Sequence, residues 1–407
     1  MGIQDRTGVS RRNVVTALAG LAGATAMGTG SWLIRPANAS GLEPVRIGVA
    51  TDITGFLGFA GAADANVARL AVARINAQGG LLGRAVELYV EDTASDESAA
   101  VSAARKLVQQ HKVDMVVGGI LSSTRTAIKD VITGRGKKLY IYPQLYEGGE
   151  CTPFVYCTGP TPAQQCDSLI PWLVKNGGRR FALPAANFLW PRKLNEYARK
   201  KIEEHGGEVV FEEYHTPDQI EYGATVSRIM AERADVVFNT ISPPGVSTFF
   251  KQLHQAGFNK NGGRLSCCYY DENTLGLNQP EEIEGLATCL DYFKALTATD
   301  PVSAEIQSAY DAAYPGGALM SAGSAATGTW RGVMLWAEAV KKAGTAEREA
   351  VAEALDTARI DQSPGGPAEM AAGTRHCKMP MYIASAEAGQ YKIRSRSEGP
   401  VGPAQCQ

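Results

Sequence analysis

The sequence predicts an α/β protein made of two Rossmann-like units, and three observations favour this fold class. Short β-rich runs alternate with helical patterns from residue 45 onward. That rhythm is typical of parallel sheets with helices on both faces. It starts again after Gly159, which indicates a second sheet. Hydrophobic residues make up 44% and charged residues 20% of the 407 positions, as in an ordinary globular chain that is long enough for two or three domains.

The first unit is expected to contain four strands with helices between them. Turn signals such as Gln78-Gly79-Gly80 separate the periodic segments. We expect strands at residues 45–51, 86–92, 113–118 and 138–142, and helices at 62–76, 97–111 and 122–135.

The second unit repeats the pattern. We expect helices at residues 162–175, 191–205, 222–232, 245–256, 304–314 and 322–343, strands at 180–183, 208–214, 235–240 and 264–269, and a strand pair within 379–394. Open α/β sheets bind ligands at the carboxyl ends of their strands. Two such units facing each other therefore predict a ligand cleft.

The first 39 residues have the features of an export signal. Arg11-Arg12 precedes an apolar run at residues 14–27, and Ala37-Asn38-Ala39 provides small residues for cleavage. The apolar run is too short and too rich in glycine to anchor the protein in a membrane. We therefore predict a twin-arginine signal peptide and a periplasmic product that begins at about Ser40, with no direct membrane anchor.

Charge and cysteine content exclude several classes of function. The net charge is −2, and it becomes about −5 when the four arginines and one aspartate of the first 39 residues are removed. This balance offers no footprint for nucleic acid. The eight cysteines match no zinc pattern, and in an oxidising compartment we expect one or two disulfides and some buried thiols, with the pairing left open.

In the first unit, polar and aromatic residues follow two of the predicted strands. Gly118-Gly119 leads to Ser122 and Ser123 at a helix start, where free N–H groups suit a carboxylate or carbonyl oxygen. The loop after the next strand carries Tyr142, Gln144, Tyr146 and Glu147, which gather phenols, an amide and a carboxylate. Aromatic walls with a few polar tips suit a small polar ligand.

The second unit has similar loops at its strand ends. The candidate ligand-binding residues there are Phe188, Trp190, Thr240, Ser242, Tyr270 and Asp271. Aromatic residues more often serve packing. The recurrence of such loops at strand ends in both units is what favours a site.

The sequence carries no recognised enzyme or metal-binding signature. The chain has no Gly-x-Ser-x-Gly elbow, no His-Glu-x-x-His and no dinucleotide fingerprint. We interpret Asp92 and Asp96 as loop and cap residues, the five histidines as surface or capping residues, and Cys267 as no nucleophile. We therefore expect no catalytic residue, no metal and no cofactor.

Several motifs resemble those of type I periplasmic solute-binding proteins of the branched-chain amino-acid transporter group. The turn Asn-Ala-x-Gly-Gly-x-x-Gly-Arg at residues 76–84 is specific for that superfamily. Tyr146-Glu147-Gly148, with Gly159, Pro162 and Gln164-Gln165 downstream, is similar to the urea-binding and short-chain amide-binding branch. The chain departs from amide binders at Ile120 and Phe188, where those proteins carry tyrosines.

This resemblance implies two lobes joined by three crossovers, which close on a ligand by hinge motion. It implies lobe 1 from residues 44–157 and 290–359, lobe 2 from 158–289 and 360–395, and a tail at 396–407 after the signal peptide at 1–39. It also implies ligand contacts at Ser122, Tyr142, Gln144 and Tyr146 in lobe 1, and at Phe188, Trp190, Thr240 and Ser242 in lobe 2.

From these motifs we expect a binding protein that delivers a small polar solute to ABC permease subunits. The ligand would lie between Tyr146 and Trp190, with Ser122 and Gln144 at its polar ends. Urea or an amide needs only neutral hydrogen bonds, whereas an amino acid needs a carboxylate for its ammonium group, which Asp271, Glu272 or Glu147 could supply. A periplasmic sensor for a signalling partner is the alternative.

Overall fold

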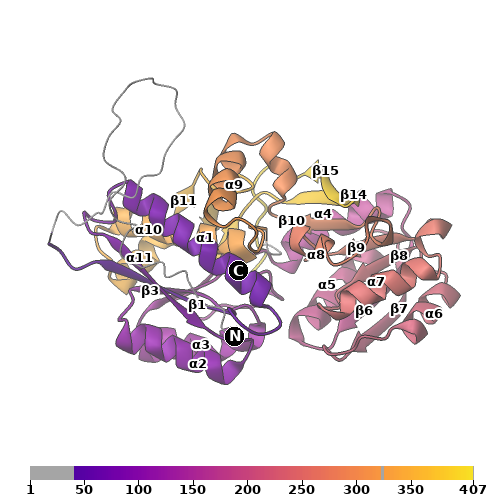
Figure 1. Cartoon of the computed structure of the whole chain (residues 1–407), viewed down its shortest axis with the longest axis horizontal. Helices are drawn as coiled ribbons and strands as arrows, with labels where there is room; N and C mark the ends of the chain where they lie inside the picture. Colours follow the sequence, from indigo (N-terminus) through magenta and orange to yellow (C-terminus); the bar gives the residue numbers. More distant parts are fainter. Residues whose placement is uncertain (1–40, 322–324, 407) are drawn as a thin grey trace, which may run out of the picture. The chain divides into compact units, whose positions relative to one another are not determined.

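The structure is a computed structural model that describes residues 41–321 and 325–406 (Figure 1). The predicted signal peptide lies outside the described residues. Among the described residues, no helix combines the length and the apolar character needed to cross a membrane.

The first sheet has eight strands in the order β11-β12-β13-β5-β4-β3-β1-β2. The pairs from β13 to β2 are parallel, and β11-β12 and β12-β13 are antiparallel. Its strands are β1 (Val45–Thr51), β2 (Val86–Asp92), β3 (Met115–Gly118), β4 (Leu139–Tyr142), β5 (Val155–Cys157), β11 (Arg359–Ile360), β12 (Ala368–Ala371) and β13 (His376–Lys378).

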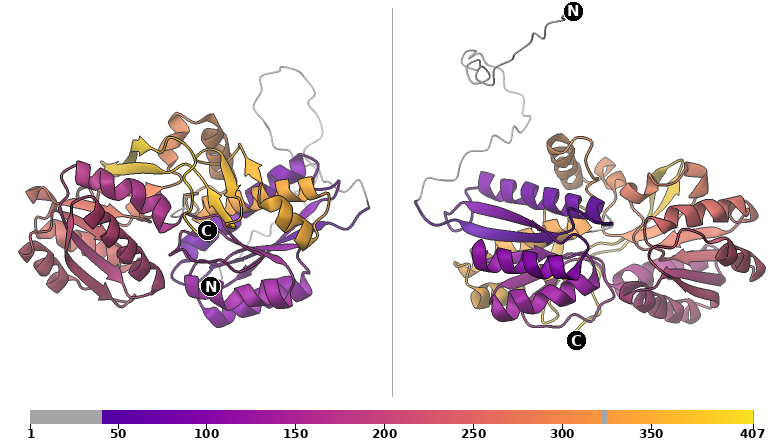
Figure 2. Two further views of the ribbon diagram at one scale, coloured as in Figure 1. Left: turned by 180° about the vertical axis from the view of Figure 1, so that it is seen from behind. Right: turned by 60° about the horizontal axis from the view of Figure 1, so that its bottom comes forward.

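Helices cover both faces of the first sheet because successive strand residues point to opposite sides. Met115 and Val117 of β3 belong to the same apolar core as α1 and α10, whereas Val116 packs with α2 and α3. Figures 1 and 2 show α1 beside α10 on one face and α2 with α3 on the other. The helices are α1 (Gly58–Ala77), α2 (Glu97–Arg105), α3 (Ser122–Lys129), α10 (Ala325–Ala343) and α11 (Arg348–Leu355). The predicted helices at 97–111 and 122–135 continue after α2 and α3 as the π-helical segments η1 (Lys106–Gln110) and η2 (Asp130–Arg135).

The second sheet has seven strands in the order β15-β14-β10-β9-β8-β6-β7. Only β14 runs antiparallel to both of its neighbours. Its strands are β6 (Arg180–Ala186), β7 (Glu208–His215), β8 (Val236–Asn239), β9 (Arg264–Cys267), β10 (Ala287–Leu290), β14 (Tyr382–Glu387) and β15 (Gln390–Arg396). The remaining helical segments are α4 (Pro162–Lys175), α5 (Leu189–Glu204), α6 (Gly223–Ala231), α7 (Gly245–Gln255), η3 (Asn259–Asn261), α8 (Glu272–Leu275), η4 (Pro280–Glu282), η5 (Lys294–Ala298) and α9 (Pro301–Ala313).

The chain passes between the two sheets three times: from β5 to α4, from β10 towards α10, and from β13 to β14. Arg331 of α10 links the first two passages. Its Nε donates to the carbonyl oxygen of Thr158 at 3.0 Å, and its Nη1 pairs with the carboxylate of Asp291. Both side chains of this ion pair are buried. The architecture confirms the predicted fold class of two α/β units with three crossovers.

One part of the predicted division into lobes is wrong. Residues 360–395 were assigned to the second lobe, but β12 and β13 belong to the first sheet. The reason is that β13 adds in parallel to β5 through His376 and Cys157, and β12 pairs with β13. The strand pair predicted within 379–394 is present as β14 and β15 of the second sheet.

The C-terminal tail returns from the second sheet to the first. Val401 donates its N–H to the carbonyl oxygen of Met379 at 2.8 Å, and Thr161 donates its hydroxyl to Pro403 at 2.9 Å. Cys406 then forms a disulfide with Cys151, which is 255 residues away in sequence. The tail therefore runs along two of the three crossovers and is covalently fixed beyond them.

We predict that replacing both disulfide cysteines, Cys151→Ser with Cys406→Ser, lowers the free energy of unfolding by about 2–4 kcal/mol, because the disulfide restricts the unfolded chain over a long loop. Urea denaturation measures the change. Dithiothreitol should destabilise the wild type to a similar extent and leave the double variant unaffected. Equal stability of the two proteins under oxidising conditions would contradict the prediction.

Candidate functional site

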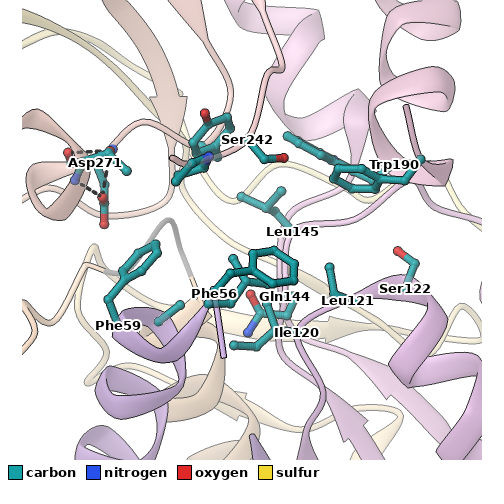
Figure 3. Close-up of a pocket in the computed structure, with 16 residues that line it drawn as sticks. Phe56, Phe59, Ile120, Leu121, Ser122, Gln144, Leu145, Trp190, Ser242 and Asp271 are labelled. Atoms are coloured by element: carbon teal, nitrogen blue, oxygen red, sulfur yellow. Dashed lines mark hydrogen bonds between the residues drawn. The ribbon is translucent and has the colours of Figure 1, made fainter. Parts of the chain in front are cut away.

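A cavity of about 770 Å³, with its opening to solvent included, is lined by loops that follow strands of both sheets (Figure 3). The first sheet contributes the segments after β1, β3 and β4, and the second contributes those after β6, β8 and β9. Both sheets belong to one compact unit of the chain. The cavity lies where the strand-end rule predicts a ligand site.

The loop after β1 brings Phe56 and Phe59 to the cavity. Asp92 shapes this loop, because its carboxylate accepts hydrogen bonds from the backbone N–H groups of Ile53 and Thr54 at 2.9 and 3.1 Å. Phe56 remains 51% exposed even though it lines the cavity. A large apolar ring is therefore available for contact with a ligand.

The segment after β3 brings Ile120, Leu121 and Ser122 to the cavity. The chain can leave β3 this sharply because Gly118 has a φ of 133°, and a Cβ atom there would lie 2.0 Å from the carbonyl oxygen of Ala50. Helix α3 begins at Ser122 without a side-chain cap at Leu121. The start of α3 therefore brings the positive end of its dipole to the edge of the cavity.

Gln144 and Leu145 follow β4 and form the next part of the lining. The Nε2 of Gln144 donates to the carboxylate of Asp64 at 3.2 Å. Asp64 also accepts from Thr51 at 3.0 Å and from Thr329 at 3.2 Å, and it is fully buried. Burial raises the pKa of Asp64 to about 7, although the hydroxyl hydrogen bonds act in the opposite direction.

The second sheet contributes three aromatic rings. The ring centroids of Phe188 and Trp190 lie 6.4 Å apart, and those of Trp190 and Tyr269 lie 6.0 Å apart in an edge-to-face arrangement. Ser242 and Pro243 follow β8 and adjoin this group. Such ring pairs are mutually stabilising, so the aromatic wall is held in place before any ligand binds.

Asp271 lines the cavity at the start of α8. Its carboxylate accepts from the backbone N–H of Thr274 at 3.1 Å, and its own N–H donates to the Thr274 hydroxyl at 2.7 Å. The carboxylate also accepts from the Thr274 hydroxyl at 3.1 Å and from the Nδ2 of Asn273 at 3.2 Å. Asp271 therefore caps a helix and also places a negative charge at the lining.

Apolar side chains dominate the lining as a whole. Phe56, Phe59, Phe188, Trp190 and Tyr269 supply aromatic surface, joined by leucine, isoleucine, alanine and proline. The polar groups are hydroxyls, one amide and one carboxylate. Of the described residues that line the cavity, none is Lys, Arg or His.

The structure brings together only some of the predicted site residues. Those that line the cavity are Ser122, Gln144, Phe188, Trp190, Ser242 and Asp271. Those that do not line it are Ser123, Tyr142, Tyr146, Glu147, Thr240 and Tyr270.

The expectation that Tyr146 and Trp190 enclose a ligand is wrong for Tyr146. Its ring is fully buried, and its hydroxyl contacts the Nε2 of His376. Tyr142 is buried as well, and its hydroxyl donates to the carbonyl oxygen of Ile120 at 2.8 Å. The guanidinium of Arg125 lies 4.8 Å from the centroid of each of these two rings. Both tyrosines therefore form the core behind α3.

Two of the histidines also differ from the prediction. His376 and His215 are 1% and 4% exposed, so they are not surface residues. Burial lowers the pKa of both imidazoles. His376 is buried because β13 lies inside the first sheet, with a strand on each side.

Ser123 and Glu147 lie beside the cavity without lining it. Ser123 is exposed at the start of α3. Glu147 accepts from the Ser122 hydroxyl at 2.5 Å and from Arg125 at 2.7 Å. Its charge is therefore already paired within the first lobe.

In the second lobe, Thr240 is buried at the end of β8. Tyr270 is also buried, and its hydroxyl donates to Asn278 at 2.7 Å, whereas its neighbour Tyr269 lines the cavity. Adjacent residues of an extended chain point in opposite directions. A sequence pattern that ends in two tyrosines does not determine which of them faces the cavity.

Phe56 and Phe59 are not among the predicted site residues, which come from the loops after other strands. The signal was present: two phenylalanines follow the first strand within Gly55-Phe56-Leu57-Gly58-Phe59. Applying the strand-end rule to β1 would have included them.

Asp96 and Cys267, which were considered as possible chemical groups, have structural surroundings. Asp96 is the N-cap of α2, as predicted, and accepts from the backbone N–H of Ala99 at 2.8 Å. In the described ranges, no group of three or more His, Cys, Asp or Glu side chains is arranged to hold a metal ion. Burial raises the pKa of Cys267 to about 12, which keeps that thiol protonated and unreactive.

The chain belongs to the periplasmic binding protein family, whose model matches residues 44–390. It is similar to the Leu/Ile/Val-binding protein BraC3 of Rhizobium johnstonii, with 27% identity over 53% of this chain and 59% of that protein. It is also similar to the Leu/Ile/Val-binding protein of Escherichia coli K12, with 24% identity over the same shares. The chain thus matches about 59% of the length of these curated relatives.

Solved structures of solute-binding proteins share the fold. A protein from Rhodopseudomonas palustris BisB5 in complex with 3,4-dihydroxybenzoic acid superposes with a TM-score of 0.78 and 21% identity, covering 89% of this chain and 99% of that one. The leucine-binding protein LivK of Thermotoga maritima gives a TM-score of 0.75 and 20% identity, covering 86% and 98%. At these identities the likeness establishes the two-lobe fold alone.

We predict that Asp64 makes the stability of the protein depend on pH. An exposed aspartate has a pKa of about 3.9, and burial raises that of Asp64 to about 7. The folded state therefore holds a proton that the unfolded state has lost. The resulting stability is complete below about pH 4 and is lost as pH rises to about 7, by at most about 1.4 kcal/mol per pH unit.

Urea denaturation of the wild type and of Asp64→Asn between pH 5 and 8 tests this prediction. The free energy of unfolding of Asp64→Asn, relative to that of the wild type, should increase as pH rises to about 7. Above that pH the difference between the two proteins should stay constant. Contributions from other groups are common to both proteins and cancel in the difference. A difference that does not change with pH would contradict the prediction.

Proposed function

We propose that this protein is the extracytoplasmic substrate-binding protein of an ABC importer and that its ligand is a small molecule with an apolar body. An apolar amino acid is the first candidate. One observation carries the proposal: the strand-end loops of both sheets enclose a cavity whose walls are mainly aromatic and aliphatic, with few polar groups. Small-molecule sites have this composition, because apolar contact supplies affinity and a few polar groups fix orientation.

The lining favours an apolar ligand over urea or a short-chain amide. A urea molecule has little apolar surface and would leave the rings of Phe56 and Phe59 in the lining uncovered. An aliphatic or aromatic side chain removes this surface from water, which contributes about 25 cal/mol for each Å². Urea and amides remain as competing ligands in the test.

Charge favours an amino acid over an aromatic carboxylate. Asp271 makes the lining negative, and none of the described lining residues is a cation. An ammonium group is attracted by this charge, while the start of α3 suits the carboxylate of the same ligand. The five aromatic rings favour an aromatic carboxylate as the second candidate, and similar solved structures hold benzoates.

The proposal is tested by titrating the protein with L-leucine, L-phenylalanine, 4-hydroxybenzoate, urea and acetamide. Tryptophan fluorescence, to which Trp190 contributes, is the first readout and calorimetry is the second. We expect saturable binding of an apolar amino acid and no response to urea or acetamide. Trp190→Phe should lose most of the fluorescence change and keep heat of binding. Binding of urea alone would overturn the proposed ligand class, and binding of none of the five would overturn the assignment of the cavity.

Asp271→Asn separates the two candidate ligands. Asparagine can keep the cap on Thr274 while it removes the negative charge, although it also removes the hydrogen bond that Asp271 accepts from Asn273. We expect the affinity for the amino acid to fall about threefold to tenfold, about 0.7–1.4 kcal/mol. The affinity for 4-hydroxybenzoate should stay equal or rise, because repulsion is removed. A loss for both ligands would indicate damage to the site rather than an effect of charge.

Delivery to a membrane permease and export through the twin-arginine route complete the proposal. The Arg11-Arg12 pair supports export, and the family supports transport. A sensor for a membrane receptor is the alternative: a permease operon beside the gene favours transport, and a lone receptor kinase favours sensing.

In a twin-arginine-competent bacterium, we expect the periplasmic fraction to contain a protein that begins at about Ser40 by mass spectrometry. Replacing both arginines by lysine should retain the full-length chain in the cytoplasm.

A further inference from the structure

A buried carboxylate lies directly behind the cavity. Asp64 projects from α1, is completely buried and does not itself line the cavity. It accepts three hydrogen bonds: from Thr51 at the end of β1, from Thr329 of α10 and from Gln144 after β4. Of these partners, Gln144 alone reaches the cavity.

The chemistry of this contact determines which end of the Gln144 amide meets a ligand. An ionised carboxylate has only acceptors, so the amide must turn its NH₂ group towards Asp64. Gln144 is 4% exposed and has little room to adopt another position. Its oxygen accepts no hydrogen bond among the described residues, and it is not sealed from solvent. In Figure 3 this oxygen points towards the cavity and the nitrogen points away from it.

We propose that Asp64 is a positioning residue that orients the Gln144 amide, so that the cavity presents a carbonyl oxygen and selects ligands with an N–H or O–H donor at that point. This inference rests on the proposed function and makes the substrate class more specific: the apolar ligand carries an amino group that Gln144 recognises. Asp64 acts through Gln144 and does not touch the ligand.

The network has a second arrangement when Asp64 is protonated. Its O–H can then donate to the Gln144 oxygen, which turns the NH₂ group towards the cavity, and both threonine hydroxyls can rotate to suit. The titratable neighbours are Asp52, whose charge raises the pKa of Asp64, and the phenol of Tyr310. Because burial raises the pKa of Asp64 to about 7, both arrangements are accessible near neutral pH.

Matched ligand pairs test the selection. L-Leucine and 4-methylpentanoate differ only in the amino group, as do L-phenylalanine and 3-phenylpropanoate. Calorimetry at pH 8, where Asp64 is mainly ionised, gives the ratio of affinities within each pair. We expect the wild type to prefer the amino compound, and Asp64→Asn to reduce that preference about tenfold, in line with a lost hydrogen bond to a charged group.

Gln144→Met removes the acceptor itself and should reduce the same ratio by a similar factor. The double variant should show no further reduction, because both changes remove one interaction. The matched control is Asp52→Asn. Asp52 is also a buried carboxylate, but it accepts from Thr93 and Ser95 rather than from Gln144. Its replacement should leave the ratio unchanged.

A purely structural role for Asp64 would lower the affinity for both members of a pair equally and would add to the effect of Gln144→Met. Either result would overturn the inference while leaving the proposed function intact. If the wild type binds no member of either pair, the proposed ligand fails, and a ligand-free readout decides the inference.

That readout is the side-chain amide resonance of Gln144 in the ligand-free protein, labelled at glutamine nitrogen and assigned by its absence in Gln144→Met. We expect it to shift between pH 6 and 8 in the wild type, to shift over a lower pH range in Asp52→Asn because that variant removes a charge that raises the pKa of Asp64, and to stay constant in Asp64→Asn. The inference would be overturned if the chemical shift of this resonance did not change with pH in the wild type, or if it changed to the same extent in Asp64→Asn.

Discussion

The candidate site depends on the parallel direction of the strands in its two sheets. Because β1, β3 and β4 run the same way, the chain leaves all three at one edge of the first sheet. The same holds for β6, β8 and β9 in the second sheet. Side chains far apart in sequence, such as Phe56 and Gln144, thereby line one cavity.

Behind the apolar walls, the first lobe contains two polar clusters with different tasks. Arg125, with Glu147 and Glu150, forms a buried ionic cluster under the start of α3. Lys129 also pairs with Glu150, so two positive and two negative charges compensate one another, and the cluster holds the loop after β4 rather than offering a charge to a ligand. Among the residues that the structure describes, Asp64 has hydroxyl and amide donors but no cation as hydrogen-bond partners. Ionising the buried Asp64 therefore costs free energy, and this cost raises its pKa to about 7.

The crossovers are held by a buried ion pair and by a tail that ends in a disulfide. Arg331 and Asp291 join two of the three passages within the core, and the tail from Val401 to Cys406 runs along the outside of two passages. The cavity lies between the elements that these passages connect. The cavity therefore lies beside the segments that join the two sheets.

The sequence by itself determined the alternation of strands and helices, the two sheets and the strand-end loops, because hydrophobic periodicity and turn residues are local signals. It also determined six lining residues, among them Ser122, Gln144 and Trp190. Only the tertiary structure decided that Tyr269 rather than Tyr270 faces the cavity, that Tyr146 lies in the core, and that β13 joins the first sheet. These outcomes depend on side-chain direction and on pairing between distant strands, which no local pattern encodes.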